Sequence, residues 1–191
     1  MNSKSTAKAY SSKLVLTYLK NAELFWILSF SVLTAIAAQI SIPTQPVPFT
    51  LQTLVVLLAG AFLGPINGAL SMMLYLLAGA FGLPVFANFA GGFPHLFGPT
   101  GGYLLAFPVA AYLVGLAVEK RGNFISVAAS MIVALAIILF FGAFYLSYFV
   151  GNDIKTAMII GAQTFTVWAL AKVAVALAVY FSLPEKFRRL P

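Results

Sequence analysis

One lysine stands deep in an apolar stretch of the chain, where a charge is costly. Lys172 lies within VWALAKVAVALAVYF, residues 167–181, and the whole sequence has only four acidic residues. A lone ammonium group within a membrane helix indicates a functional site by default. We expect Lys172 to meet the carboxylate of a bound ligand. The alternatives are that its side chain snorkels to the membrane interface or pairs with Asp153.

Uncharged polar and aromatic side chains are expected near the same side of the protein as Lys172. The polar ones are Thr44, Gln45, Gln52, Asn88, His95, Thr100, Tyr103 and Gln163. Their amide and hydroxyl groups suit a neutral polar ligand part, such as an amide or ureido group, whereas His95, a lone histidine in a loop, is expected to face water. The aromatic ones, Phe49, Phe86, Phe89, Tyr103 and Trp168, could wall an apolar ring, or could simply pack the bundle.

The residues for common catalytic chemistry are missing from this set. The chain has no cysteine and a single histidine, His95, so thiol chemistry and a metal centre are not expected. Asp153 is the one carboxylate expected on that side, whereas acid–base catalysis by two carboxylates needs a pair. The sequence therefore predicts a binding protein without cofactor or metal, and not an enzyme.

The segment Gly79–Tyr103 is too irregular to lie in lipid. It holds seven of the 15 glycines and three of the 10 prolines, carries no Lys, Arg, Asp or Glu, and is flanked by long apolar runs. Lipid cannot satisfy its open backbone groups, so irregular backbone at membrane depth must be buried in protein or line a cavity. Such a cavity is a place to hold a small ligand.

Composition places these segments in a membrane protein. The 191 residues are 62% hydrophobic and 8% charged, with mean hydropathy +1.01. We expect an all-α, six-transmembrane-helix bundle with irregular outer-face loops: a basic arm over residues 1–20, then one membrane domain over residues 21–191. The expected helices are about 24–40, 50–63, 67–81, 101–118, 124–150 and 166–183. A brief helix, Ile154–Ile160, is expected to end at Gly161.

Two features of these helices concern contacts. The second and third helices are shorter than a full span and are separated by Gly64-Pro65, a pattern that indicates a binding site in transporters. On the first helix, the pairs Ser31/Ala35 and Thr34/Ala38 have the spacing that permits close helix approach, either within the chain or with another subunit.

Basic residues predict the orientation in the cell membrane. Six spans put nine Lys and Arg residues on the side of the two termini, against Lys155 alone on the other side. Both termini are therefore expected in the cytoplasm, and the connectors 41–49, 81–98 and 151–165 on the outer face. These positions also explain the net charge of +7 without a nucleic-acid partner.

Two long segments resemble the BioY family, the biotin-specific substrate-capture (S) components of energy-coupling factor (ECF) vitamin transporters. They are PVPFTLQTLVVLLAGAFLGPINGALSMMLYLLAGAFGLPVFA, Pro46–Ala87, and FGPTGGYLLAFPVAAYLVG, Phe97–Gly115. The resemblance implies a six-helix membrane protein that binds biotin from outside. It also implies partners: a transmembrane coupling subunit and two ATPase subunits. One departure is TFTVWALAK, Thr164–Lys172, where the family usually reads close to PFLPGDLLK, so Ala169 replaces an aspartate.

For biotin, the chemistry of the predicted site assigns a role to each residue. Lys172 meets the carboxylate; Gln52, Asn88 and the backbone near Gly91 and Gly92 meet the ureido group; Phe49, Phe86, Tyr103 and Trp168 flank the ring. The connector Ser41–Phe49, which contains Thr44, is expected to act as a lid. The alternatives are an S component for another vitamin, a structural membrane subunit and a self-powered carrier.

Overall fold

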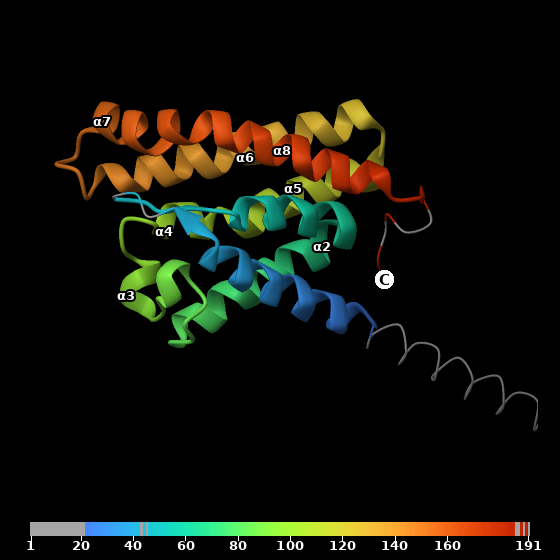
Figure 1. Ribbon diagram of the computed structural model, residues 1–191, viewed down its shortest axis with the longest axis horizontal. Coiled ribbons are helices and arrows are strands. Elements are labelled where there is room, and N and C mark those ends of the chain that lie inside the picture. Colours follow the sequence, from blue (N-terminus) through green and yellow to red (C-terminus); the bar gives the residue numbers. More distant parts are fainter. Residues whose placement is uncertain (1–21, 43, 45, 186–187, 189, 191) are drawn as a thin grey trace, which may run out of the picture.

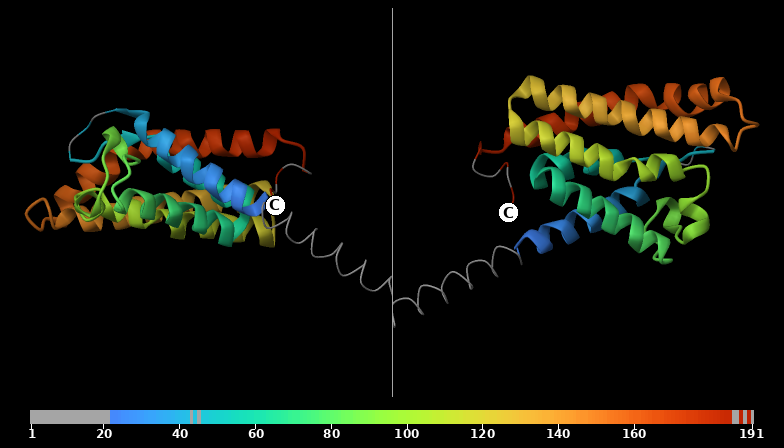
Figure 2. Two further views of the ribbon diagram at one scale, coloured as in Figure 1. Left: turned by 90° about the horizontal axis from the view of Figure 1, so that it is seen from below. Right: turned by 180° about the vertical axis from the view of Figure 1, so that it is seen from behind.

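The computed structural model describes residues 22–42, 44, 46–185, 188 and 190, and for residues 162–166 the backbone alone. The arm predicted over residues 1–20 lies outside the described residues. The chain forms a bundle of long helices with its longer connectors gathered at one end (Figure 1). At the opposite end lie both the first described helix turn and the last described residues, and two further views agree (Figure 2).

Apolar helices make up most of the described chain. Four of them are long and apolar enough to cross a membrane: Ala22–Gln39 (the N-terminal helix), α2 (Gln52–Ala80), Gly101–Lys120, and α6 (Phe124–Ser147). The third is built from α4 (Gly101–Leu105) and α5 (Phe107–Lys120). α8, Thr164–Ser182, adds a shorter apolar segment. The prediction of an all-α membrane protein is confirmed.

α2 is two helical segments that fold back on each other at Gly64. The backbone there is non-helical, with φ 77° and ψ −174°, a conformation that favours glycine. Gly68, just after the break, packs against the backbone of Ala59 and Gly60, just before it. The two short helices expected around Gly64-Pro65 are therefore present, and the N-terminal end of the first lies beside the second.

The expectation that Gly161 ends a helix was wrong. α7 (Ile154–Met158) continues through a π-helical turn, Ile159–Gln163, directly into α8. Gly161 has a packing role instead: the Tyr103 hydroxyl donates to its carbonyl at 3.2 Å and occupies the space that a side chain would need. The π turn is the local deformation that lets the helix run on through this contact.

Two of the connectors at the loop-bearing end have little regular structure. In the first, β1 (Ser41–Ile42) and β2 (Phe49–Thr50) form a short antiparallel pair. The second carries a 3₁₀ turn, Ala87–Phe89, and the one-turn helix α3, Phe93–Leu96.

Gln39 shows how the irregular loop after α2 is satisfied. Its side-chain amide donates to the Phe86 carbonyl at 3.0 Å and accepts from the Phe89 N–H at 2.9 Å. Two tyrosines add to this, since Tyr75 donates to the Val85 carbonyl at 3.1 Å and Tyr145 to the Phe97 carbonyl at 3.1 Å. Side chains therefore form the hydrogen bonds that this backbone would otherwise make with water and that lipid cannot make.

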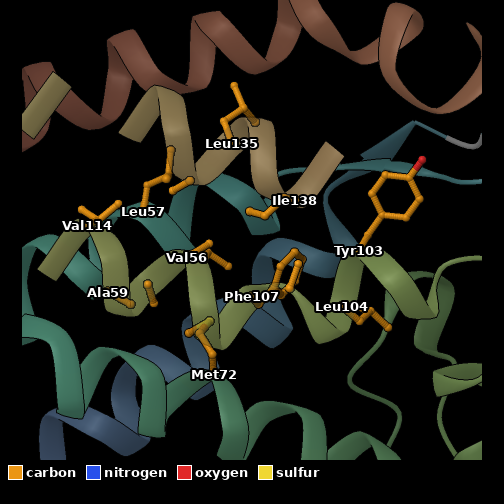
Figure 3. Packing of buried hydrophobic residues seen from close by; sticks show 14 of the residues in the cluster. Val56, Leu57, Ala59, Met72, Tyr103, Leu104, Phe107, Val114, Leu135 and Ile138 are labelled. Carbon is orange, nitrogen blue, oxygen red and sulfur yellow. The ribbon is translucent and has the colours of Figure 1, made fainter. Parts of the chain in front are cut away.

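The buried core joins α2, α5 and α6, and the N-terminal helix packs onto it. Figure 3 shows Phe107 beside Val56 and Ile138 within this core. On the N-terminal helix, Thr34 and Ala38 are fully buried, and the Thr34 hydroxyl approaches the Met72 sulfur at 3.8 Å. The partner of the Thr34/Ala38 pair is therefore internal.

Candidate functional site

A cavity of about 70 Å³ lies at the loop-bearing end of the bundle. Its wall comes from the first connector, the start of α2, the second connector, α4, α5, α6 and α8. It is lined by Val47, Pro48, Thr50, Gln52, Thr53, Phe86, Ala87, His95, Thr100, Tyr103, Leu104, Phe107, Leu135, Ile138, Leu139, Ala169 and Lys172. Four of the predicted site residues, Lys172, Gln52, Tyr103 and Phe86, are thus brought together. We call this space the inner cavity.

Lys172 reaches from α8 to the start of α2. Its Nζ atom donates to the Thr50 carbonyl at 2.6 Å and to Thr53 Oγ1 at 2.9 Å, and lies 3.9 Å from the centre of the Phe49 ring. An ammonium group has three N–H donors, so these two hydrogen bonds leave one donor for a ligand. The predicted alternative of pairing with Asp153 is not what the hydrogen bonds show, because Asp153 instead accepts from Lys155 and Thr156.

Gln52 belongs to a chain of hydrogen bonds that fixes one wall of the inner cavity. Its Oε1 accepts from the Thr50 hydroxyl at 2.7 Å, its Nε2 donates to the Tyr75 hydroxyl, and Tyr75 donates onward to the Val85 carbonyl. Both halves of α2 and the loop that follows are thereby tied together. The side-chain amide predicted to meet a ligand thus already has protein partners on its oxygen and its nitrogen.

The middle of the inner cavity is apolar. α6 contributes Leu135, Ile138 and Leu139, and Phe107 on α5 and Ala169 on α8 complete this part of the wall. Figure 3 shows Ile138 pointing toward the helix that carries Phe107, with Leu135 on the same helix as Ile138. The departure from the family pattern at Ala169 therefore places a small apolar group on the cavity wall, three residues before Lys172.

His95 borders the inner cavity and a second, larger space. Its ring stacks on Phe86, with centroids 5.8 Å apart and planes 18° apart. The second space, which we call the adjacent hollow, has a volume of about 390 Å³ and holds the predicted residues Thr44 and Asn88. The two spaces share four wall residues: Pro48, Ala87, His95 and Thr100.

The other predicted residues lie outside the inner cavity. Trp168 is 58% exposed and packs its ring 6.0 Å from that of Phe49, which itself lies beneath the Lys172 ammonium group. Gly91 packs tightly against the Leu83 carbonyl, and the Gly92 N–H donates to the Gly79 carbonyl at 2.6 Å. These two glycines shape the loop.

Sequence reasoning missed Thr53 as a partner of Lys172, and it left His95 and Thr100 out of the site. For Thr53 the signal was its place next to Gln52, at the start of α2. A lone histidine in a loop gives no comparable pattern.

Comparisons with known proteins bear on the whole chain. A model of the BioY family matches residues 7–189. The "Biotin transporter BioY" of Thermotoga maritima is 44% identical over 82% of this chain and 92% of its own length. The "Probable biotin transporter BioY" of Pyrococcus horikoshii is 42% identical over 84% of this chain and 95% of its own length.

One solved structure has the same fold. It is described as the S-component for biotin from an ECF-type ABC transporter, and it covers 88% of this chain and 96% of its own. The TM-score is 0.74 and the sequence identity 24%.

Proposed function

Because the chain belongs to the BioY family, we propose that it is the biotin-binding S component of an ECF-type uptake transporter. The observation that carries this proposal is the family match over residues 7–189, together with a cavity whose wall combines a lysine, hydroxyl groups and apolar side chains. The curated relatives are named as transporters, which agrees with the prediction that the chain is not an enzyme.

The inner cavity has complementary groups for the carboxylate and the thioether ring of biotin. Lys172 offers its remaining N–H donor to the valerate carboxylate, in surroundings where a charge-assisted hydrogen bond is strong. Leu135, Ile138 and Phe107 offer an apolar surface to the thioether ring. Biotin is then a bound substrate, and no cofactor takes part.

The size of the inner cavity indicates that it widens when biotin enters. Its volume of about 70 Å³ is less than half of the ~150 Å³ of an engineered cavity that binds benzene. The connector 41–49 contributes Val47 and Pro48 to the wall of the inner cavity, and it is the segment that we propose as the lid. Pro46 and Pro48 limit the conformations that this lid loses on closure.

The arrangement in the membrane extends the proposal to partners. The described helices give six apolar segments when α2 is divided at Gly64, and the described ends of the chain lie at one end of the bundle (Figure 1). Six crossings with both termini in the cytoplasm would place the inner cavity toward the outside. A transmembrane coupling subunit and two ATPases would then act from the lipid and cytoplasmic sides.

Binding of labelled biotin to the purified full chain in detergent tests the proposal. We expect saturable binding that unlabelled biotin displaces and that thiamine and riboflavin leave unchanged. Displacement by thiamine or riboflavin instead would make the chain an S component for another vitamin. No binding of any of the three by folded protein would favour a structural membrane subunit.

A further inference from the structure

The imidazole of His95 is held by ring packing and leaves its nitrogens open. Among the described residues its recorded contact is the stack on Phe86, with no hydrogen bond to either ring nitrogen. Within the same residues, no buried side-chain nitrogen or oxygen lacks a partner. The imidazole nitrogens are therefore at least partly exposed, and His95 lines both the inner cavity and the adjacent hollow.

The plane of the imidazole is set by a rigid support. Phe86 is 1% exposed, its ring meets Tyr75 edge-on at 5.6 Å, and Gln39 binds its carbonyl. α3, which carries His95, is tied to the end of α2 because its N-cap residue, Gly92, donates its N–H to the Gly79 carbonyl at 2.6 Å. A ring stacked on such a support presents its edge, where the nitrogens lie, in a fixed plane.

The polar groups of the inner cavity form two sets on different elements. Lys172 with Thr50 and Thr53 joins α8 to the start of α2, whereas His95 and Thr100 belong to the connector before α4. An imidazole can make one hydrogen bond with a cyclic urea, which carries both donors and an acceptor, because the two ring nitrogens point in different directions. A ligand with a carboxylate on Lys172 would therefore bring its second polar group to a matching partner.

We infer that His95 binds the ureido group of the ligand, an inference that rests on the proposed function. The two side chains predicted for that task are placed less well. Gln52 already hydrogen bonds with Thr50 and Tyr75, and Asn88 lines only the adjacent hollow. The imidazole thus selects ligands by their ring system, while Lys172 selects ligands with a negatively charged tail.

Two substitutions separate hydrogen bonding from stacking. His95→Phe keeps an aromatic ring against Phe86 but removes both nitrogens, whereas His95→Gln removes the ring but keeps a donor and an acceptor. With one hydrogen bond worth roughly 1.4 kcal/mol, we expect His95→Phe to weaken biotin about tenfold. We expect His95→Gln to stay within about threefold of the unaltered chain.

Biotin amide, which lacks the carboxylate, identifies the ligand group involved. His95→Phe should weaken biotin and biotin amide by the same factor, because both keep the ureido ring. The inference is overturned if His95→Phe binds like the unaltered chain, if His95→Gln binds as weakly as His95→Phe, or if only biotin is affected. If the unaltered chain binds biotin, each of these outcomes overturns only the role of His95, and the proposed function stands. If the unaltered chain does not bind biotin, the proposed function and the role of His95 both fail.

Discussion

The two polar groups of the inner cavity are positioned in different ways. Lys172 is fixed by directed hydrogen bonds to Thr50 and Thr53 on another element, and its ammonium group rests on the Phe49 ring. His95 is fixed by stacking on Phe86, with its nitrogens left open. Hydrogen bonds position Lys172, and they leave a single N–H donor for a ligand. Ring packing positions His95, and it leaves both ring nitrogens for a ligand.

Because they are positioned differently, Lys172 and His95 recognise different features of a ligand. A positioned charge gains most from an opposite charge, and leaving a charge unpaired in a buried site is costly. A neutral ring edge gains about one ordinary hydrogen bond and selects the pattern of donors and acceptors. We therefore expect the Lys172 group to dominate affinity and the His95 group to refine specificity, so that its loss costs about tenfold, as argued above.

The largest effect is expected at Lys172. Lys172→Ala should weaken biotin about 100-fold, because a hydrogen bond to a charged group in a buried site contributes roughly 2–3 kcal/mol. Biotin amide should lose far less, since its tail carries no charge. Equilibrium binding of both ligands to the purified variant measures this contrast.

Lys155→Ala is the matched control, because Lys155 is an exposed lysine in the loop-side helix α7. It should bind both ligands like the unaltered chain. Equal losses of biotin and biotin amide in Lys172→Ala would refute the carboxylate assignment.

A smaller effect is expected where the support of His95 is removed. Gln39→Leu leaves the Phe86 carbonyl and the Phe89 N–H without their partner, which should lower the free energy of unfolding by roughly 1–3 kcal/mol. Biotin and biotin amide should weaken together, by less than about tenfold, as the Phe86 platform loosens.

Thermal unfolding in detergent and binding of both ligands give the two readouts for Gln39→Leu. Ser29→Ala on the same helix is the control, because the Ser29 hydroxyl only bonds back to the Phe25 carbonyl of its own helix. If Gln39→Leu melted and bound like Ser29→Ala, the loop would not depend on Gln39.

The smallest effect is expected at Thr53. Thr53→Val keeps the shape of the side chain but removes one of the two acceptors that orient the Lys172 ammonium group. Biotin should weaken about threefold, roughly half the value of an ordinary hydrogen bond, because the Thr50 carbonyl still holds Lys172. Biotin amide should hardly change, so a loss shared by both ligands would place the role of Thr53 in folding.

The sequence predicted the features that a local pattern can reveal. A charge within an apolar run identified Lys172, and Gly64-Pro65 identified the break in α2, because lipid and backbone geometry each penalise these residues directly. The gathering of Gln52, Phe86, Tyr103 and Lys172 around one cavity followed from placing their segments at the same end of the bundle. Whether each of them touches biotin stays a prediction.

Features that depend on distant packing could not be predicted. Gln39 was not singled out because its partners lie in a loop about fifty positions away, and no local rule links them. Gly161 was assigned as a helix end by a rule of sequence that the contact with Tyr103 overrides. His95 was left out for the same reason, since its importance follows from the Phe86 ring beneath it.

An experimental structure of the full chain with biotin bound tests the central claim most directly. The account predicts biotin within the widened inner cavity, with a carboxylate oxygen about 2.8 Å from Lys172 Nζ and the ureido group at hydrogen-bond distance from the His95 ring. A reversed ligand, with its carboxylate at His95 and its ureido group at Lys172, would contradict the account. So would biotin held only in the adjacent hollow.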